Sequence, residues 1–244
     1  MTFDVLLAAL LVFIATTIGS IFLFLVKSDD KRKNVFYLAF AAGVMFFSVF
    51  ELFINAIDKT IDVTLLIYFF AGVTAVALGE HLIPHVHYFI RKKSITPSKK
   101  KTALVIGAIA IHNFPEGFAI ASAFLHSASL GWLITFAIAL QDIPEGFMVS
   151  APAYVYGIRK KVAIYLGSLS GFLEAISVIF SYYLLSSFSS INNIALAFSA
   201  GAMTNVVLLE VLPDAFSEQK YRTWAVISFF IGLALVFALS LFFS

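Results

Sequence analysis

Long apolar stretches alternate with short polar segments along the whole chain. A helix that crosses a bilayer needs about 20 predominantly apolar residues, and windows of this kind can be found by scanning hydropathy. The pattern predicts an all-α integral membrane protein with eight transmembrane helices, at approximately 3–26, 34–57, 63–90, 102–125, 130–154, 162–186, 191–216 and 223–243.

The spacing of these windows leaves little chain outside the membrane. Eight spans in 244 residues allow roughly 30 residues each, close to a helix plus a turn. The sequence therefore predicts one transmembrane domain, 1–244, whose chemistry lies inside its helices. The first window ends in charged residues rather than in a small-residue cleavage motif, so we expect a retained span and not a removed signal peptide.

Composition agrees with a membrane protein. Hydrophobic residues make up 61% of the chain and charged residues only 12%, whereas soluble domains carry about 25% charged residues. A net charge of +2 gives no field that would attract nucleic acid. With no cysteine, disulfides, thiolate metal sites and cysteine nucleophiles are all excluded.

The positions of the basic residues predict the orientation. Of the 16 lysines and arginines, all but Lys59 lie in the segments that follow the first, third, fifth and seventh spans. Because cytoplasmic loops are enriched in basic residues, these segments should be cytoplasmic and both termini extracytoplasmic. The segment 91–101 is then a short basic cytoplasmic loop, and we expect a multi-pass protein of the plasma membrane.

Two internal repeats connect spans that run in opposite directions. His112-Asn113-Phe114-Pro115-Glu116-Gly117-Phe118 is matched 29 residues later by Gln141-Asp142-Ile143-Pro144-Glu145-Gly146-Phe147. A weaker repeat relates 39–45 to 197–203, and each copy is followed by a glutamate, Glu51 or Glu210. Convergence of apolar helices on Ala, Phe and Gly is the alternative for the weaker repeat. Inverted repeats are typical of transporters that bind substrate at the bilayer midplane.

The stronger repeat carries polar side chains into the membrane. At about 1.5 Å per residue, His112, Gln141 and Glu174 should lie near the midplane, together with Asn113, Glu116, Asp142 and Glu145. Each charge there costs at least about 2.5 to 3.5 kcal/mol on insertion scales. No lysine or arginine lies inside these spans, so the acids are either protonated or surround a cation. Four carboxylates match the charge of two divalent ions; a structural, non-transporting polar core is the alternative.

Spacing favours a metal. The pairs His112/Glu116 and Gln141/Glu145 are four residues apart and therefore share a helical face. Pro115 and Pro144 leave backbone carbonyls four residues earlier without a hydrogen-bond donor. Imidazole, amide and carboxylate ligands without sulfur suit divalent ions such as Zn(II), Fe(II), Mn(II), Co(II), Ni(II) or Cd(II). A structural zinc site would usually contain cysteine.

These motifs resemble the signature of the ZIP (Zrt/Irt-like protein) family of divalent-metal transporters, most closely its compact prokaryotic members. The resemblance implies helices 1–3 related by inversion to helices 6–8, around helices 4 and 5. It also implies a binuclear metal site, transport toward the cytoplasm, an elevator-like movement of helices 1, 4, 5 and 6, and frequent homodimers.

The resemblance assigns ligands to two ions. The first would be held by His112, Glu116, Gln141 and Glu145, and the second by Asn113, Glu116, Asp142, Glu145 and Glu174. Many members have His and Asn or Glu in place of Gln141 and Asp142, which leaves metal preference open. The loop 91–101 lacks the histidines that are common there in the family.

Other polar or sulfur-containing residues are candidate pathway ligands. Glu51 and Glu210 could act at opposite ends of the path, with Met45 and Met203 lining it, although packing is the commoner role of methionine. Near the inner end of the third span, Glu80, His81, His85 and His87 could capture released metal or be solvated. Asp214 and His126 are expected at the surface.

The leading hypothesis is transport of divalent metal, with zinc first and iron, manganese and cadmium as further substrates. The transported ion would be the only bound metal, with no other cofactor. The lipid bilayer is the other expected partner, besides the homodimer that the resemblance implies. An intramembrane metalloprotease is disfavoured because the H-E-x-x-H pattern is absent, so no enzymatic activity is expected. A proton or alkali-cation carrier remains the open alternative.

Overall fold

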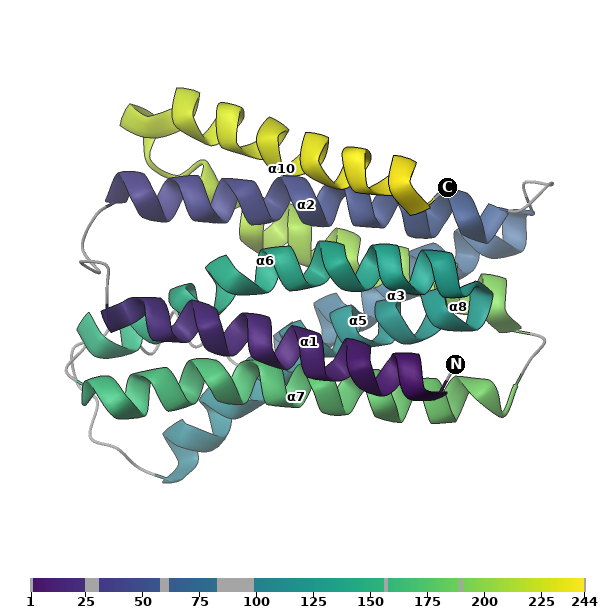
Figure 1. The fold of residues 1–244 in the computed structure, drawn as a ribbon, viewed down its shortest axis with the longest axis horizontal. Helices are drawn as coiled ribbons and strands as arrows, with labels where there is room; N and C mark the ends of the chain where they lie inside the picture. The colour runs from purple at the N-terminus through teal and green to yellow at the C-terminus, as the bar shows by residue number, and fades with distance from the viewer. Residues whose placement is uncertain are drawn as a thin grey trace.

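The computed structural model describes residues 2–24, 31–57, 62–82, 99–155, 158–188 and 191–243. Within these ranges the side chains of residues 31, 80–82, 99–112, 152 and 155 are not described. All regular structure in the described part of the chain is helical (Figure 1). The long helices are α1 (Thr2–Ile21), α2 (Lys31–Ile57), α3 (Val63–Leu82), α5 (Lys99–His126), α6 (Ala128–Val155), α7 (Lys160–Ser186), α8 (Asn192–Val206) and α10 (Arg222–Phe243).

Short elements extend three of these helices. The 3₁₀ turn η1 (Phe22–Phe24) continues α1, and η4 (Gln219–Tyr221) precedes α10. After α8 the chain forms a π-helical turn, η3 (Val207–Val211), and then α9 (Leu212–Ala215). Together, α8, η3 and α9 occupy the predicted window 191–216.

Every predicted window falls on one of these helices. The window 63–90 runs beyond Leu82 into residues outside the described part. α5 begins at Lys99, three residues before the predicted start, because lysine is a good helix former and the helix does not end where the apolar residues end. Six of the described helices are long and apolar enough to cross a bilayer: α1–η1, α2, α6, α7, α8–α9 and η4–α10. The chain is a multi-pass membrane protein.

The helices lie roughly side by side, with their ends gathered at two faces of the bundle. In Figure 1, α2, α7 and α10 begin at the left, and both chain termini lie at the right. The first residues of these three helices, Lys31, Lys160 and Arg222, belong to predicted cytoplasmic basic segments, so these residues lie at one end of the bundle (Figure 1).

Small residues face the interior, and large apolar residues face outward. The buried face of α1 includes Ala8, Ala15 and Gly19, while Phe3 is 71% and Phe242 is 83% exposed. A surface of exposed apolar side chains is unfavourable in water but not in contact with lipid. Small residues at the helix contacts let the backbones approach closely, which is how helices pack in membranes.

Reciprocal glycines mark the closest contacts between α3 and α8. A Cβ atom on Gly72 would collide with the backbone carbonyl of Phe198, and one on Gly201 would collide with that of Phe69. The obstacle in both cases is main chain, so it cannot rotate away as a side chain can.

We expect Gly201→Leu to destabilise the fold. Overpacking typically costs about 1–3 kcal/mol, and a collision with backbone should fall at the upper end of that range. The thermal unfolding midpoint of detergent-purified protein measures the effect. Ala75→Leu, at an exposed position of α3, is the control; equal midpoints for the two variants would contradict the packing described here.

Candidate metal centre

Three helices place carboxylates at one buried point. α5 contributes Glu116, α6 contributes Asp142 and Glu145, and each offers an oxygen within 4.8 Å of the others. Glu174 of α7 lies close enough to all three to repel them electrostatically. Glu116 is 1% exposed, and Asp142 and Glu174 are completely buried. The four acids that the sequence singled out therefore share one site.

The two amides of the motifs join α5 to α6. Gln141 Nε2 donates a hydrogen bond of 2.6 Å to Glu116 Oε1, and Asn113 Nδ2 donates one of 3.4 Å to Glu145 Oε1. Each amide nitrogen thus points at a carboxylate on the other helix. The carbonyl oxygen of Gln141 has no hydrogen-bond donor among the described residues, whereas that of Asn113 accepts a hydrogen bond from Ser170.

Ser170 belongs to the same cluster, and the sequence analysis missed it. Its hydroxyl lies 3.0 Å from Asn113 Oδ1 and 3.3 Å from Glu145 Oε1, and its side chain is completely buried. Ser170 precedes Glu174 by four residues and so shares its face of α7. That spacing was the available signal, but serine is too common in apolar helices to be selected by residue type.

Many oxygens of the site lack a hydrogen-bond donor. Among the side chains that the structure describes, none donates to Glu116 Oε2, Gln141 Oε1, either oxygen of Asp142 or either oxygen of Glu174. Unpaired buried polar atoms are costly, and each needs an explanation such as an ion. Among the described side chains these candidate ligand atoms are all oxygens, which suits hard to borderline divalent cations.

The glycines of the two Pro-Glu-Gly motifs allow neighbouring helices to approach beside the glutamates. A Cβ atom on Gly117 would lie 2.7 Å from Ser177 of α7, and one on Gly146 would collide with the Thr16 carbonyl of α1. Ser177 also donates a hydrogen bond of 3.0 Å to the Phe114 carbonyl. The repeat therefore encodes a carboxylate together with the close helix contact that holds it.

His112 lies in α5, but its side chain is outside the described part of the chain. The same is true of Glu80 and His81 in α3, while His85, His87 and residues 91–98 fall outside the described residues altogether. Their predicted roles stay predictions.

The remaining candidate residues have surroundings that differ from those of the carboxylates. Met45 and Met203 are buried in the main apolar core, which is the packing role considered above. Glu51 is partly buried and accepts a hydrogen bond of 3.4 Å from Asn55. Glu210 lies in the π-helical turn η3. Asp214 and His126 are exposed, as expected.

Comparison with known proteins places this chain in a family. The model of the ZIP zinc transporters matches residues 90–240. The zinc transporter ZupT of Chlorobaculum parvum is 38% identical, over 95% of this chain and 94% of its own length. ZupT of Chlorobium chlorochromatii is 33% identical over 91% and 92%, and ZupT of Clostridium perfringens is 36% identical over 93% of each chain. The chain belongs to the ZIP family of zinc transporters, which are membrane transporters and not enzymes.

Proposed function

We propose that this protein carries divalent transition-metal ions, zinc foremost, across the membrane and toward the cytoplasm through the carboxylate cluster of α5, α6 and α7. The observation that carries the proposal is the set of buried oxygens without donors on Glu116, Asp142 and Glu174. A divalent cation offsets the repulsion among these carboxylates and supplies the missing partner of each oxygen. The names of the similar proteins support zinc as the substrate.

Two ions fit the ligand arrangement. Glu116 and Glu145 lie on facing helices and would bridge both ions. His112 and Gln141 would complete the first position, and the second would be completed by three residues: Asn113, Asp142 and Glu174. Gln141 Nε2 already bonds Glu116, so its Oε1 is the atom left for the metal. An amide oxygen binds zinc less strongly than imidazole does, and we therefore include iron, manganese and cadmium among the substrates.

The helix contacts support eight spans built as an inverted repeat. α1 packs along α6 as α7 packs along α5, and α2 packs along α10 as α8 packs along α3. α2 also contacts α6 as α8 contacts α5. Each contact in these comparisons becomes its partner contact when α1, α2 and α3 are equated with α7, α8 and α10, and α5 with α6.

One pair of contacts breaks this correspondence. α6 packs extensively against α7, whereas the described residues of α1 and α5, the equivalent pair, make few contacts. Two repeats in different conformations are what alternating access requires, since the site must open to one side at a time.

We infer that α1, α5, α6 and α7 move as a group against the other helices. We also infer that the basic end of the bundle is cytoplasmic, and that Glu51 and Glu210 act toward the entry and the exit of the metal path.

Glu116→Ala should abolish metal flux. The substitution removes a ligand shared by both proposed ions, so its effect should exceed the roughly 10- to 100-fold loss that removal of an outer-shell partner causes. Zinc uptake into proteoliposomes measures it. Asp214→Asn, an exposed carboxylate in α9, should transport normally, and substantial flux through the Glu116 variant would refute the site assignment.

Competition distinguishes a metal transporter from a proton or alkali-cation carrier. We expect excess Zn²⁺ to inhibit Cd²⁺ uptake, because both ions need the same oxygens, and excess K⁺ to leave it unchanged. Inhibition by K⁺ equal to that by Zn²⁺ would favour the alternative carrier.

Ser170→Ala should weaken metal binding without unfolding the protein. The hydroxyl fixes Asn113 and Glu145 relative to each other, and loss of such a positioning partner typically costs about 10- to 100-fold in metal affinity. Zinc affinity of purified protein is the readout, and Ser170→Thr, which keeps the hydroxyl, should restore it.

Ser181→Ala is the matched control for this substitution. Ser181 is equally buried on the same helix, and its hydroxyl has no hydrogen-bond partner among the described residues. Equal losses of affinity in the two alanine variants would show that Ser170 has no specific role in the site.

A further inference from the structure

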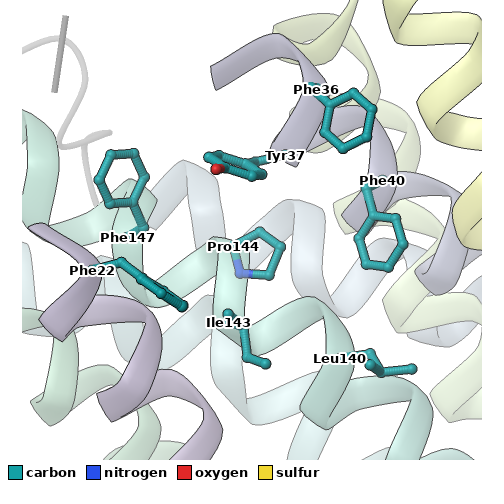
Figure 2. Close-up of a pocket in the computed structure, with 8 residues that line it drawn as sticks. All are labelled: Phe22, Phe36, Tyr37, Phe40, Leu140, Ile143, Pro144 and Phe147. Carbon is teal, nitrogen blue, oxygen red and sulfur yellow. The ribbon is translucent and has the colours of Figure 1, made fainter. Parts of the chain in front are cut away.

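An aromatic groove lies on the side of α6 that faces α2 (Figure 2). Its volume is about 460 Å³, and it is partly open to the surroundings. Apart from the Tyr37 hydroxyl its lining side chains are apolar, and they come from η1, α2 and α6: Phe22, Phe36, Tyr37, Phe40, Leu140, Ile143, Pro144 and Phe147. We name this pocket the α2–α6 groove.

The groove lies within the membrane-spanning part of the chain. All its lining residues belong to the apolar spans α1–η1, α2 and α6, and Phe22 at its edge is 38% exposed. Its volume is in the range of about 300–1,000 Å³ typical of ligand pockets. Water is a poor occupant because it needs two to four polar partners. The apolar molecule that is always present at this depth is a lipid acyl chain.

Two cations lie against aromatic rings of residues that are close to the groove lining in the sequence or on an adjoining helix. Arg32 precedes Phe36 by one helical turn on the same face of α2, and its guanidinium lies 4.0 Å from the centroid of the Trp224 ring. Lys160 Nζ lies 4.7 Å from the ring centroid of Phe24, two residues beyond Phe22. Aromatic rings and basic side chains together are typical of the headgroup level, and the cytoplasmic leaflet is the one that carries anionic lipid.

We propose that the α2–α6 groove binds one acyl chain of an anionic phospholipid, whose phosphate lies at Arg32 and Lys160. The choice of the cytoplasmic leaflet rests on the orientation in the proposed function. Binding itself does not depend on transport. The chain would contact Leu140, Ile143 and Pro144 on the face of α6 away from Asp142 and Glu145, so the lipid would sit behind the helix that carries half of the metal centre.

Photolabelling of the full-length protein in nanodiscs tests the proposal. Phosphatidylglycerol with a diazirine in its acyl chain is used as the probe, and labelled residues are mapped by mass spectrometry. We expect label on 36–40 and 140–147 to exceed label around Phe230, a lipid-facing residue of α10 that is 59% exposed. Equal labelling of both regions would mean ordinary bulk-lipid contact and would overturn the proposal.

Two variants test the chain and the headgroup separately. Leu140→Trp fills the groove and should reduce labelling of the groove severalfold. Phe230→Trp, which introduces the same residue at a lipid-facing position of α10, should not. Unlabelled phosphatidylglycerol should also displace the probe from the wild-type groove, which gives a test that needs no variant. Undiminished groove labelling in that competition would overturn the proposal.

The double variant Arg32→Gln/Lys160→Gln tests the anionic headgroup. Preference for phosphatidylglycerol over the matching phosphatidylcholine probe should fall by up to roughly thirtyfold, the effect of two basic residues at an anionic surface. If the wild type labels equally with both lipids, the headgroup site is wrong. None of these outcomes depends on metal flux, so failure here and failure of the proposed function are distinguishable.

Discussion

Mutual repulsion among four carboxylates governs the centre of this molecule. Glu116, Asp142, Glu145 and Glu174 meet where α5, α6 and α7 converge, and no lysine or arginine occurs in 102–154 or 162–186. A buried charge without a counter-charge is among the most costly features a protein can have. The helices cannot relieve that cost from their own side chains, so the folded site needs a positive charge from outside. The proposed metal ion would supply that charge.

Close helix packing is the second condition for this site. Gly117 and Gly146 bring α7 and α1 against the turns that carry Glu116 and Glu145. Without that approach the carboxylates would spread apart, and a small ion could not reach all of them. Large side chains point outward to lipid instead, and small residues line the interior. Many phenylalanines are therefore exposed on the outside of the bundle, because large side chains do not fit at the close helix contacts.

Hydropathy was sufficient to predict the helices and, with spacing, most of the carboxylate cluster of α5, α6 and α7. Residues such as Glu116 and Asp142 were predictable because charge is rare in apolar spans and easily noticed. Ser170 was not, since its importance comes from contacts with Asn113 and Glu145 on two other helices. The α2–α6 groove was equally inaccessible, because no single segment contains it. The π-helical turn η3 also escaped prediction, as its residues are as apolar as those of an ordinary helix.

That turn explains an inequality between the two weaker repeat segments. Met45 and Glu51 are six positions apart, whereas Met203 and Glu210 are seven apart. A π-helical turn accommodates one residue more than an α-helical turn. The turn η3 begins after Met203 and contains Glu210. The extra residue is thereby accommodated in the turn that contains Glu210. The two halves of the bundle can thus differ in length by an insertion and still present matching faces.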